Sequence, residues 1–124
     1  KGSSASVLRL AMQKFFCYTT VFNAIELFSI ARTPRETRAV EQALSAMKIL
    51  GLNGRSARSH GALRGRGLTL PRMNALVAGM CLEIRLPVLT GQRKEFSGIK
   101  ELVVISTDAV TPERSAEEIL RLGA

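Results

Sequence analysis

Residues 68–106 decide the fold of this chain: LTLPRMNALVAGMCLEIRLPVLTGQRKEFSGIKELVVIS. The apolar spacing predicts a helix that opens at Pro71 and runs to about Leu86. A buried strand over Pro87–Thr90, a polar loop, a Phe-Ser-Gly turn and a second strand over Leu102–Ser106 follow. Helix, apolar strand, loop and apolar strand are typical of an open parallel sheet flanked by helices. We therefore predict an α/β fold.

Apolar periodicity and capping residues predict elements of the same kind outside this segment. They are a helix over Ser4–Phe15, a strand over Phe16–Thr19, a helix from the cap Thr20 to Ala31, a helix from the Thr33/Glu36 capping box to Met47, a strand stub at Ile49–Leu50, a helix from Asn53 to about Arg64, and a short helix opened by Thr111-Pro112-Glu113. No repeat or linker divides the chain. We predict a single domain over 1–106 and a C-terminal extension with a short helix over 107–124.

The composition favours an aliphatic globular interior, with 46% hydrophobic residues and no Trp. No run approaches the ~20 apolar residues that a membrane span needs. Cys17 and Cys81 stand alone in predicted apolar elements. We expect them to be reduced core residues of a cytoplasmic protein.

The formal net charge is +8, and its distribution is uneven. No acid occurs between Glu41 and Glu83. The basic residues of that interval are Lys48, Arg55, Arg58, Arg64, Arg66 and Arg72. Arginine is suited to bidentate phosphate contacts, and a basic stretch of this kind is typical of nucleic-acid binding. A solvated basic face, or a docking surface for an acidic protein, accounts for the same composition.

Polar residues 91–93 follow the predicted strand 87–90, at the carboxyl edge where open α/β sheets place their sites. Gln92 is a candidate for contacting a ligand there, and Thr90 for orienting a water molecule or a phosphate. Glu95 follows the same strand and is explained by a surface pair with Arg93 or Lys100.

Glu26 and Asn74 have unusual surroundings. Glu26 lies in VFNAIELFSIA, which is apolar almost all round, and a carboxylate on such a surface is costly unless it reaches water, a hydrogen-bond partner or a metal. An amphipathic helix with Glu26 on its solvated side is the alternative. Asn74 lies in the first turn of the helix that opens at Pro71, where it either points into a cleft or caps the helix.

Other chemistries find little support. His60 is the only histidine, so a His-based triad, a His-activated cysteine or a zinc site lacks partners. RGRG at 64–67 is no phosphate-binding loop, because no strand precedes it and no GK[ST] follows. Asp108 is the only aspartate, which is unusual for a Mg²⁺ enzyme.

Three segments, TTVFNAIELFSIA (19–31), GALRGRGLTLPRMNALVAG (61–79) and LPVLTGQRKEFSGIKELVVI (86–105), resemble in order and spacing the conserved segments of PIN-domain proteins of the VapC toxin type. The resemblance covers roughly residues 4–106. It implies a PIN-like three-layer fold, with a parallel five-stranded sheet flanked by helices. It also implies a Mg²⁺- or Mn²⁺-dependent endoribonuclease that forms a homodimer and is held in check by an antitoxin protein.

PIN-type sites use about four acidic positions to hold one or two metal ions beside the scissile phosphate. Glu26 matches the family's acid in the "ELxxG"-like helix and is the expected metal ligand. Asn74 stands where the family has the Asp of its "D-x-x-I-A" helix, and Gln92 where an Asp or Asn follows the strand-Thr motif. Glu26, Asn74 and Gln92 are therefore the candidate catalytic residues.

The family's first acid lies on an opening strand with a "DTN/DTS" motif, which should precede the helix at 4–15. We expect the natural protein to have about ten or more residues before Lys1, the length of one strand and its turn. The expected RNA-binding residues are Arg55, Arg58, Arg64, Arg66, Arg72 and Arg93.

Of the acidic positions that PIN-type sites use, this chain retains Glu26, and amides stand at two others. Three interpretations follow. The first is a VapC-like ribonuclease whose metal site is weakened. The second is a degenerate PIN domain that binds RNA or a partner without cleaving. The third is a protein-binding module whose basic face meets an acidic, antitoxin-like peptide.

Overall fold

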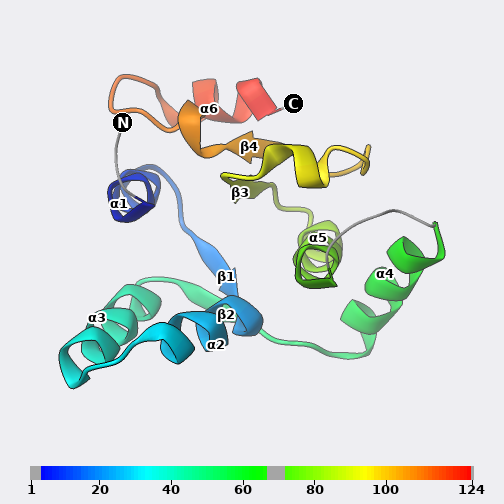
Figure 1. Cartoon of the computed structure of the whole chain (residues 1–124). Helices are drawn as coiled ribbons and strands as arrows, with labels where there is room; N and C mark the ends of the chain where they lie inside the picture. Colours follow the sequence, from blue (N-terminus) through cyan, green and yellow to red (C-terminus); the bar gives the residue numbers. More distant parts are fainter. Residues whose placement is uncertain (1–3, 67–71, 124) are drawn as a thin grey trace. The chain divides into compact units, whose positions relative to one another are not determined.

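A computed structural model describes residues 4–66 and 72–123 (Figure 1). The chain divides into two compact units. The smaller unit is Phe16–Gly51, and the larger unit joins the N-terminal helix to the chain from Leu52 onward. Within the described residues, no helix is long and apolar enough to cross a membrane.

The smaller unit consists of β1 (Tyr18–Thr20), α2 (Val21–Ile30), α3 (Pro34–Ser45) and β2 (Lys48–Leu50). β1 and β2 pair in parallel, with Thr19 opposite Ile49. Thr20 begins α2 because its hydroxyl accepts a hydrogen bond from the Asn23 amide at 3.1 Å. Thr33 and Glu36 form the reciprocal capping box that begins α3.

The larger unit contains α1 (Ser4–Lys14), α4 (Gly54–Gly65), α5 (Arg72–Ile84), β3 (Val88–Thr90), the 3₁₀ turn η1 (Arg93–Phe96), β4 (Val104–Ser106), the 3₁₀ turn η2 (Thr107–Ala109) and α6 (Ala116–Gly123). β3 and β4 pair in parallel, with Val88 opposite Val104. Asn53 begins α4 by accepting a hydrogen bond from the Ser56 amide at 3.0 Å.

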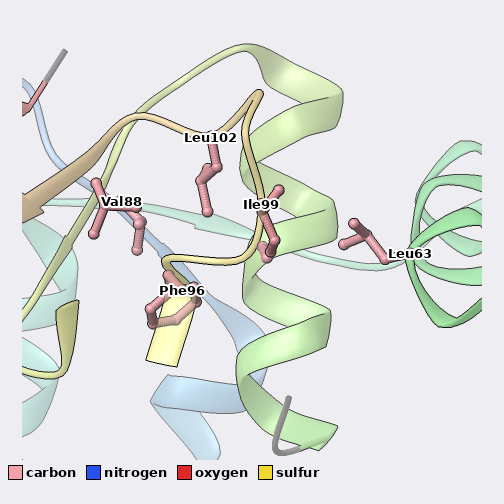
Figure 2. Packing of buried hydrophobic residues seen from close by; sticks show 7 residues of the cluster. Leu63, Val88, Phe96, Ile99 and Leu102 are labelled. Carbon is pink, nitrogen blue, oxygen red and sulfur yellow. The ribbon is translucent and has the colours of Figure 1, made fainter. Parts of the chain in front are cut away.

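The hydrophobic core of the larger unit lies between its helices and the β3–β4 sheet. Figure 2 shows Val88, Phe96, Ile99 and Leu102 gathered beside α5, with Leu63 reaching in from α4. Ala78 and Val104 complete the buried cluster. The shared core fixes α5, η1 and both strands as one packed body, so positions on these elements are defined relative to one another.

The predicted α/β fold with parallel strands is confirmed. The described strands form two two-stranded sheets, one in each unit, and their continuation into one five-stranded sheet stays a prediction. The helix starts at Thr20, Thr33 and Asn53 are confirmed. The start predicted at Pro71 lies outside the described residues.

Several predicted boundaries are wrong: α5 ends at Ile84 rather than about Leu86, and β4 begins at Val104 rather than Leu102. The first strand is Tyr18–Thr20 rather than 16–19, because its pairing with β2 starts at Tyr18. The last helix begins at Ala116 rather than near Thr111, because Ser115 and Glu118 form a reciprocal cap: the Ser115 amide donates to Glu118 at 2.8 Å, and the Glu118 amide donates to the Ser115 hydroxyl at 3.2 Å.

The segment after residue 106 packs on the sheet of the larger unit. Figure 1 shows α6 (red) beside β4 (orange). Ile119 on α6 is completely buried, and Gly123 lies so close to β4 that a Cβ there would approach Ile105 to 2.8 Å. The boundary predicted at residue 106 stays a prediction.

Candidate functional site

The candidate site lies at the carboxyl end of the β3–β4 sheet. Because the strands are parallel and Thr90 is opposite Ser106, both end at the same edge. The same kind of hydrogen bond lies at the end of each strand. The Gln92 amide donates to the Thr90 hydroxyl at 2.9 Å, and the Asp108 amide donates to the Ser106 hydroxyl at 3.2 Å. The Thr90 hydroxyl, predicted to orient a water molecule or a phosphate, thus shapes the loop that carries Gln92.

Asn74 and Glu95 lie together beside this edge. Asn74, in the first turn of α5, is half-buried, and its Nδ2 donates a hydrogen bond to Oε1 of Glu95 on η1. The two residues are 21 positions apart in the sequence. Glu95 therefore has Asn74 as its hydrogen-bond partner rather than the neighbouring basic residue that we expected.

Gln92 and Glu26, the two other candidate catalytic residues, are exposed. Gln92 stands immediately before η1, three positions ahead of Glu95. Glu26 lies on α2 of the smaller unit, so the structure describes it separately from the Asn74–Glu95 pair. Its exposure agrees with the solvated-face interpretation of this helix. The candidate catalytic role of all three residues stays a prediction.

The donor set does not fit the Mg²⁺ or Mn²⁺ centre that the resemblance implies. Among the described residues, no group of three His, Cys, Asp or Glu side chains is placed to hold a metal ion. Beside the sheet edge, Glu95 supplies a carboxylate, but its neighbour Asn74 is an uncharged amide that turns its nitrogen toward it. Hard cations require several oxygen ligands.

The predicted RNA-binding arginines differ in their surroundings. Arg55, Arg58 and Arg64 on α4 and Arg93 on η1 are exposed. Arg66 forms a bidentate pair with Glu101, at 2.9 and 3.0 Å, and this is the only ion pair within the described residues. The Arg66 guanidinium holds the pKa of the Glu101 carboxyl below its ordinary value. The Arg72 side chain lies outside the described residues.

Helix α4 is held against α5 by polar and close-packed contacts. The Ser56 hydroxyl is buried and donates to a Glu83 carboxylate oxygen at 2.7 Å. Gly79 of α5 faces the backbone of His60, where an added Cβ would lie 3.3 Å from its Cα. These contacts turn the exposed arginines of α4 toward solvent.

A surface pocket of about 320 Å³ lies at the other edge of the sheet. Its lining includes Pro87, just before β3, and Val103, just before β4. It is therefore at the amino end of the strands, away from Gln92 and the Asn74–Glu95 pair.

The fold and this edge define an α/β protein with polar residues and the exposed Arg93 at the carboxyl end of a parallel sheet, and with further exposed arginines on α4. A chain of a toxin–antitoxin complex from Klebsiella pneumoniae is similar to it, with a TM-score of 0.66 and 22% identity, over 80% of this chain and 84% of that one. A chain of VapBC2 from Rickettsia felis, solved bound to a DNA fragment from its promoter, has a TM-score of 0.63 and 18% identity, over 82% and 83%.

No protein-family model matches the chain, and no curated protein sequence gives a significant match. The predicted resemblance to VapC-type proteins is thus confirmed for the fold.

Proposed function

We propose that this chain is a VapC-like toxin: a PIN-fold protein that binds RNA, is bound by an antitoxin protein, and has only weak endoribonuclease activity. The observation that carries the proposal is the similarity of its fold, over about four-fifths of the chain, to chains from two toxin–antitoxin structures. Cytoplasmic location and a homodimer belong to the same proposal.

The arginines support RNA as the ligand. Arg55, Arg58 and Arg64 project from α4 into solvent without an acidic partner among the described residues. Guanidinium groups bind phosphates bidentately, and such contacts supply most of the affinity in sequence-independent binding. Arg66 contributes less because its guanidinium already bonds Glu101.

The apolar surface of α2 supports a protein partner. Four of its large apolar residues are exposed: Ile25 by 60%, Leu27 by 38%, Phe28 by 40% and Ile30 by 67%. Exposed apolar residues gathered on one helix are typical of a protein interface. An antitoxin segment that covers this helix with apolar side chains fits that surface.

Weak cleavage follows from the donor set. Two of the three candidate catalytic positions, Asn74 and Gln92, are amides, and the described residues do not complete a metal centre. An amide oxygen brings no charge to a cation, so Mg²⁺ or Mn²⁺ should bind poorly. Glu26 remains the expected acidic ligand.

Cleavage of a labelled structured RNA tests the proposal. The full-length gene product is incubated with Mn²⁺ or Mg²⁺, with EDTA and E26Q as controls. We expect slow, metal-dependent cuts that EDTA and E26Q abolish. Cuts that persist in EDTA, or that E26Q leaves unchanged, would contradict the proposed nuclease site.

The alternative is a degenerate PIN domain that binds RNA or an antitoxin and does not cleave. The Asn74–Glu95 hydrogen bond favours it, because a neutral amide occupies the position of a family acid. Intact RNA in every lane, together with retained RNA binding in EDTA, would select this alternative.

A further inference from the structure

The Asn74–Glu95 pair is fixed by the core beneath it. Ala75 follows Asn74 on α5, Phe96 follows Glu95 on η1, and both are 3% exposed. Each member of the pair is thus held one residue from a buried anchor. The separation of the two side chains is set by the packing of α5 against η1 rather than by a flexible loop.

The pair also lies at the edge where α/β sheets place their sites. η1 follows β3 directly after the Thr90–Gln92 turn and contacts both α5 and β4. Glu95 therefore places a carboxylate beside the carboxyl end of the sheet, although Asn74 itself carries no charge.

The side chains at positions 74 and 95 decide whether a divalent cation can bind between them. An amide nitrogen can only donate, so Asn74 satisfies one Glu95 oxygen and presents N–H groups where a cation would need oxygen ligands. Two carboxylates in the same place would repel each other, and a divalent cation between them would relieve that repulsion.

We infer that the Asn74–Glu95 hydrogen bond is the closed form of a divalent-cation site, in which one side chain, Asn74, keeps the larger unit from binding the ion. The inference rests on the proposed function for the class of ion. It assigns to Glu95, which the sequence analysis explained as a surface pair, the role of the site's carboxylate. A single substitution, N74D, opens the site, and the opened site depends on Glu95.

Mn²⁺ binding in the absence of RNA tests this inference on the full chain. Free Mn²⁺ is measured by electron paramagnetic resonance for the wild type, N74D, N74D/E95Q and Q13E. Q13E is the matched control because it adds the same charge to the same unit at an exposed position of α1.

We expect N74D to bind Mn²⁺ more tightly than the wild type, by on the order of tenfold or more, because ligand charge sets the affinity of such sites. N74D/E95Q and Q13E should bind like the wild type. The melting temperature of N74D should rise with Mn²⁺, since a ligand that binds only the folded state stabilises it.

Equal affinity of wild type and N74D, the same gain in Q13E, or a gain that survives E95Q would overturn the inference. An N74D protein that stays unfolded even in Mn²⁺ would also overturn it, because a cation between the carboxylates should restore the fold. Since no RNA is present, these outcomes are independent of whether the wild type binds or cleaves RNA.

Discussion

At the scale of single residues, Arg85 departs most from ordinary backbone geometry. It has a φ of 58°, the one positive value among the described residues other than glycine. It ends α5 in a Schellman motif: its amide donates to the Leu82 carbonyl at 3.3 Å, and the Leu86 amide donates to the Cys81 carbonyl at 3.0 Å. Glycine is the usual residue at this position because it has no Cβ to clash.

Replacing Arg85 by glycine should therefore stabilise the protein, by about 1 kcal/mol after the entropy that glycine adds to the unfolded chain. Urea unfolding measures the change. The control is R38G in the middle of α3, where helical φ is required and a loss of about 1 kcal/mol is expected. Destabilisation by R85G would show that the left-handed cap is not strained.

The buried thiol of Cys81 makes the stability of the protein depend on pH. Burial raises the pKa of its thiol from the ordinary 9.0 to about 11. The unfolded thiol therefore ionises before the folded one, and the stability present below pH 9 is lost as the pH rises towards about 11. The loss is at most roughly 2–3 kcal/mol, from about 1.4 kcal/mol for each pKa unit.

The free energy of unfolding, measured from pH 8 to 11 for wild type and C81A, checks this expectation. The free energy of unfolding of C81A should fall less over this pH range than that of the wild type. Parallel curves for the two proteins would mean that the Cys81 thiol ionises alike in the folded and unfolded states.

At the scale of helices and strands, the contact between α4 and α5 depends on Gly79. A Cβ at Gly79 would lie 3.3 Å from both N and Cα of His60, which are backbone atoms of α4 and cannot rotate away. G79A should destabilise the protein by about 1–3 kcal/mol, because the two helices must separate.

G61A is the matched control, since Gly61 is also inside a helix but has nothing within 4 Å of its added Cβ. That change should stabilise by about 0.5–1 kcal/mol through helix propensity alone. Thermal unfolding of both variants gives the comparison. A stabilised G79A would contradict the close approach of the two helices.

Sequence predicts elements best where their ends are set by neighbouring residues. Thr20, Thr33 and Asn53 each bond an amide three positions ahead, so their caps can be predicted from spacing alone. The start of the terminal helix is ambiguous in the sequence, because Thr111-Pro112-Glu113 and Ser115–Glu118 both have capping patterns. Only the bonds of Ser115 and Glu118 decide between them.

At the scale of the whole molecule, sequence predicts the fold and part of the site. The parallel α/β class follows from the order of helix and apolar strand, and the position of Asn74 marks it as a candidate. Its partner Glu95 could not be found this way, because 21 residues separate them and only the packing of η1 on α5 brings them together. Likewise, the pairing of Arg66 with Glu101 spans 35 positions.

The molecule has a formal net charge of +8. We expect the arginines that have no acidic partner among the described residues to contact RNA phosphates. RNA binding is the claim that separates the proposed toxin, and a degenerate form that still binds RNA, from a domain that binds only a protein. Arg55 and Arg58 are exposed on α4, whereas Arg66 is bonded to Glu101 and serves as a matched arginine whose replacement removes the same kind of charge.

The most direct measurement is the salt dependence of RNA binding in EDTA, by fluorescence anisotropy, for wild type, R55A/R58A and R66A. We expect the double variant to bind more weakly and its log–log salt slope to be shallower by about 1.4, because each phosphate bound by an arginine contributes roughly 0.7 to the slope. R66A, which removes one arginine, should change the slope by less than the roughly 0.7 of one phosphate contact, since Glu101 already holds its guanidinium. Wild-type affinity and slope in R55A/R58A would contradict RNA binding by α4 and favour a protein-binding module instead.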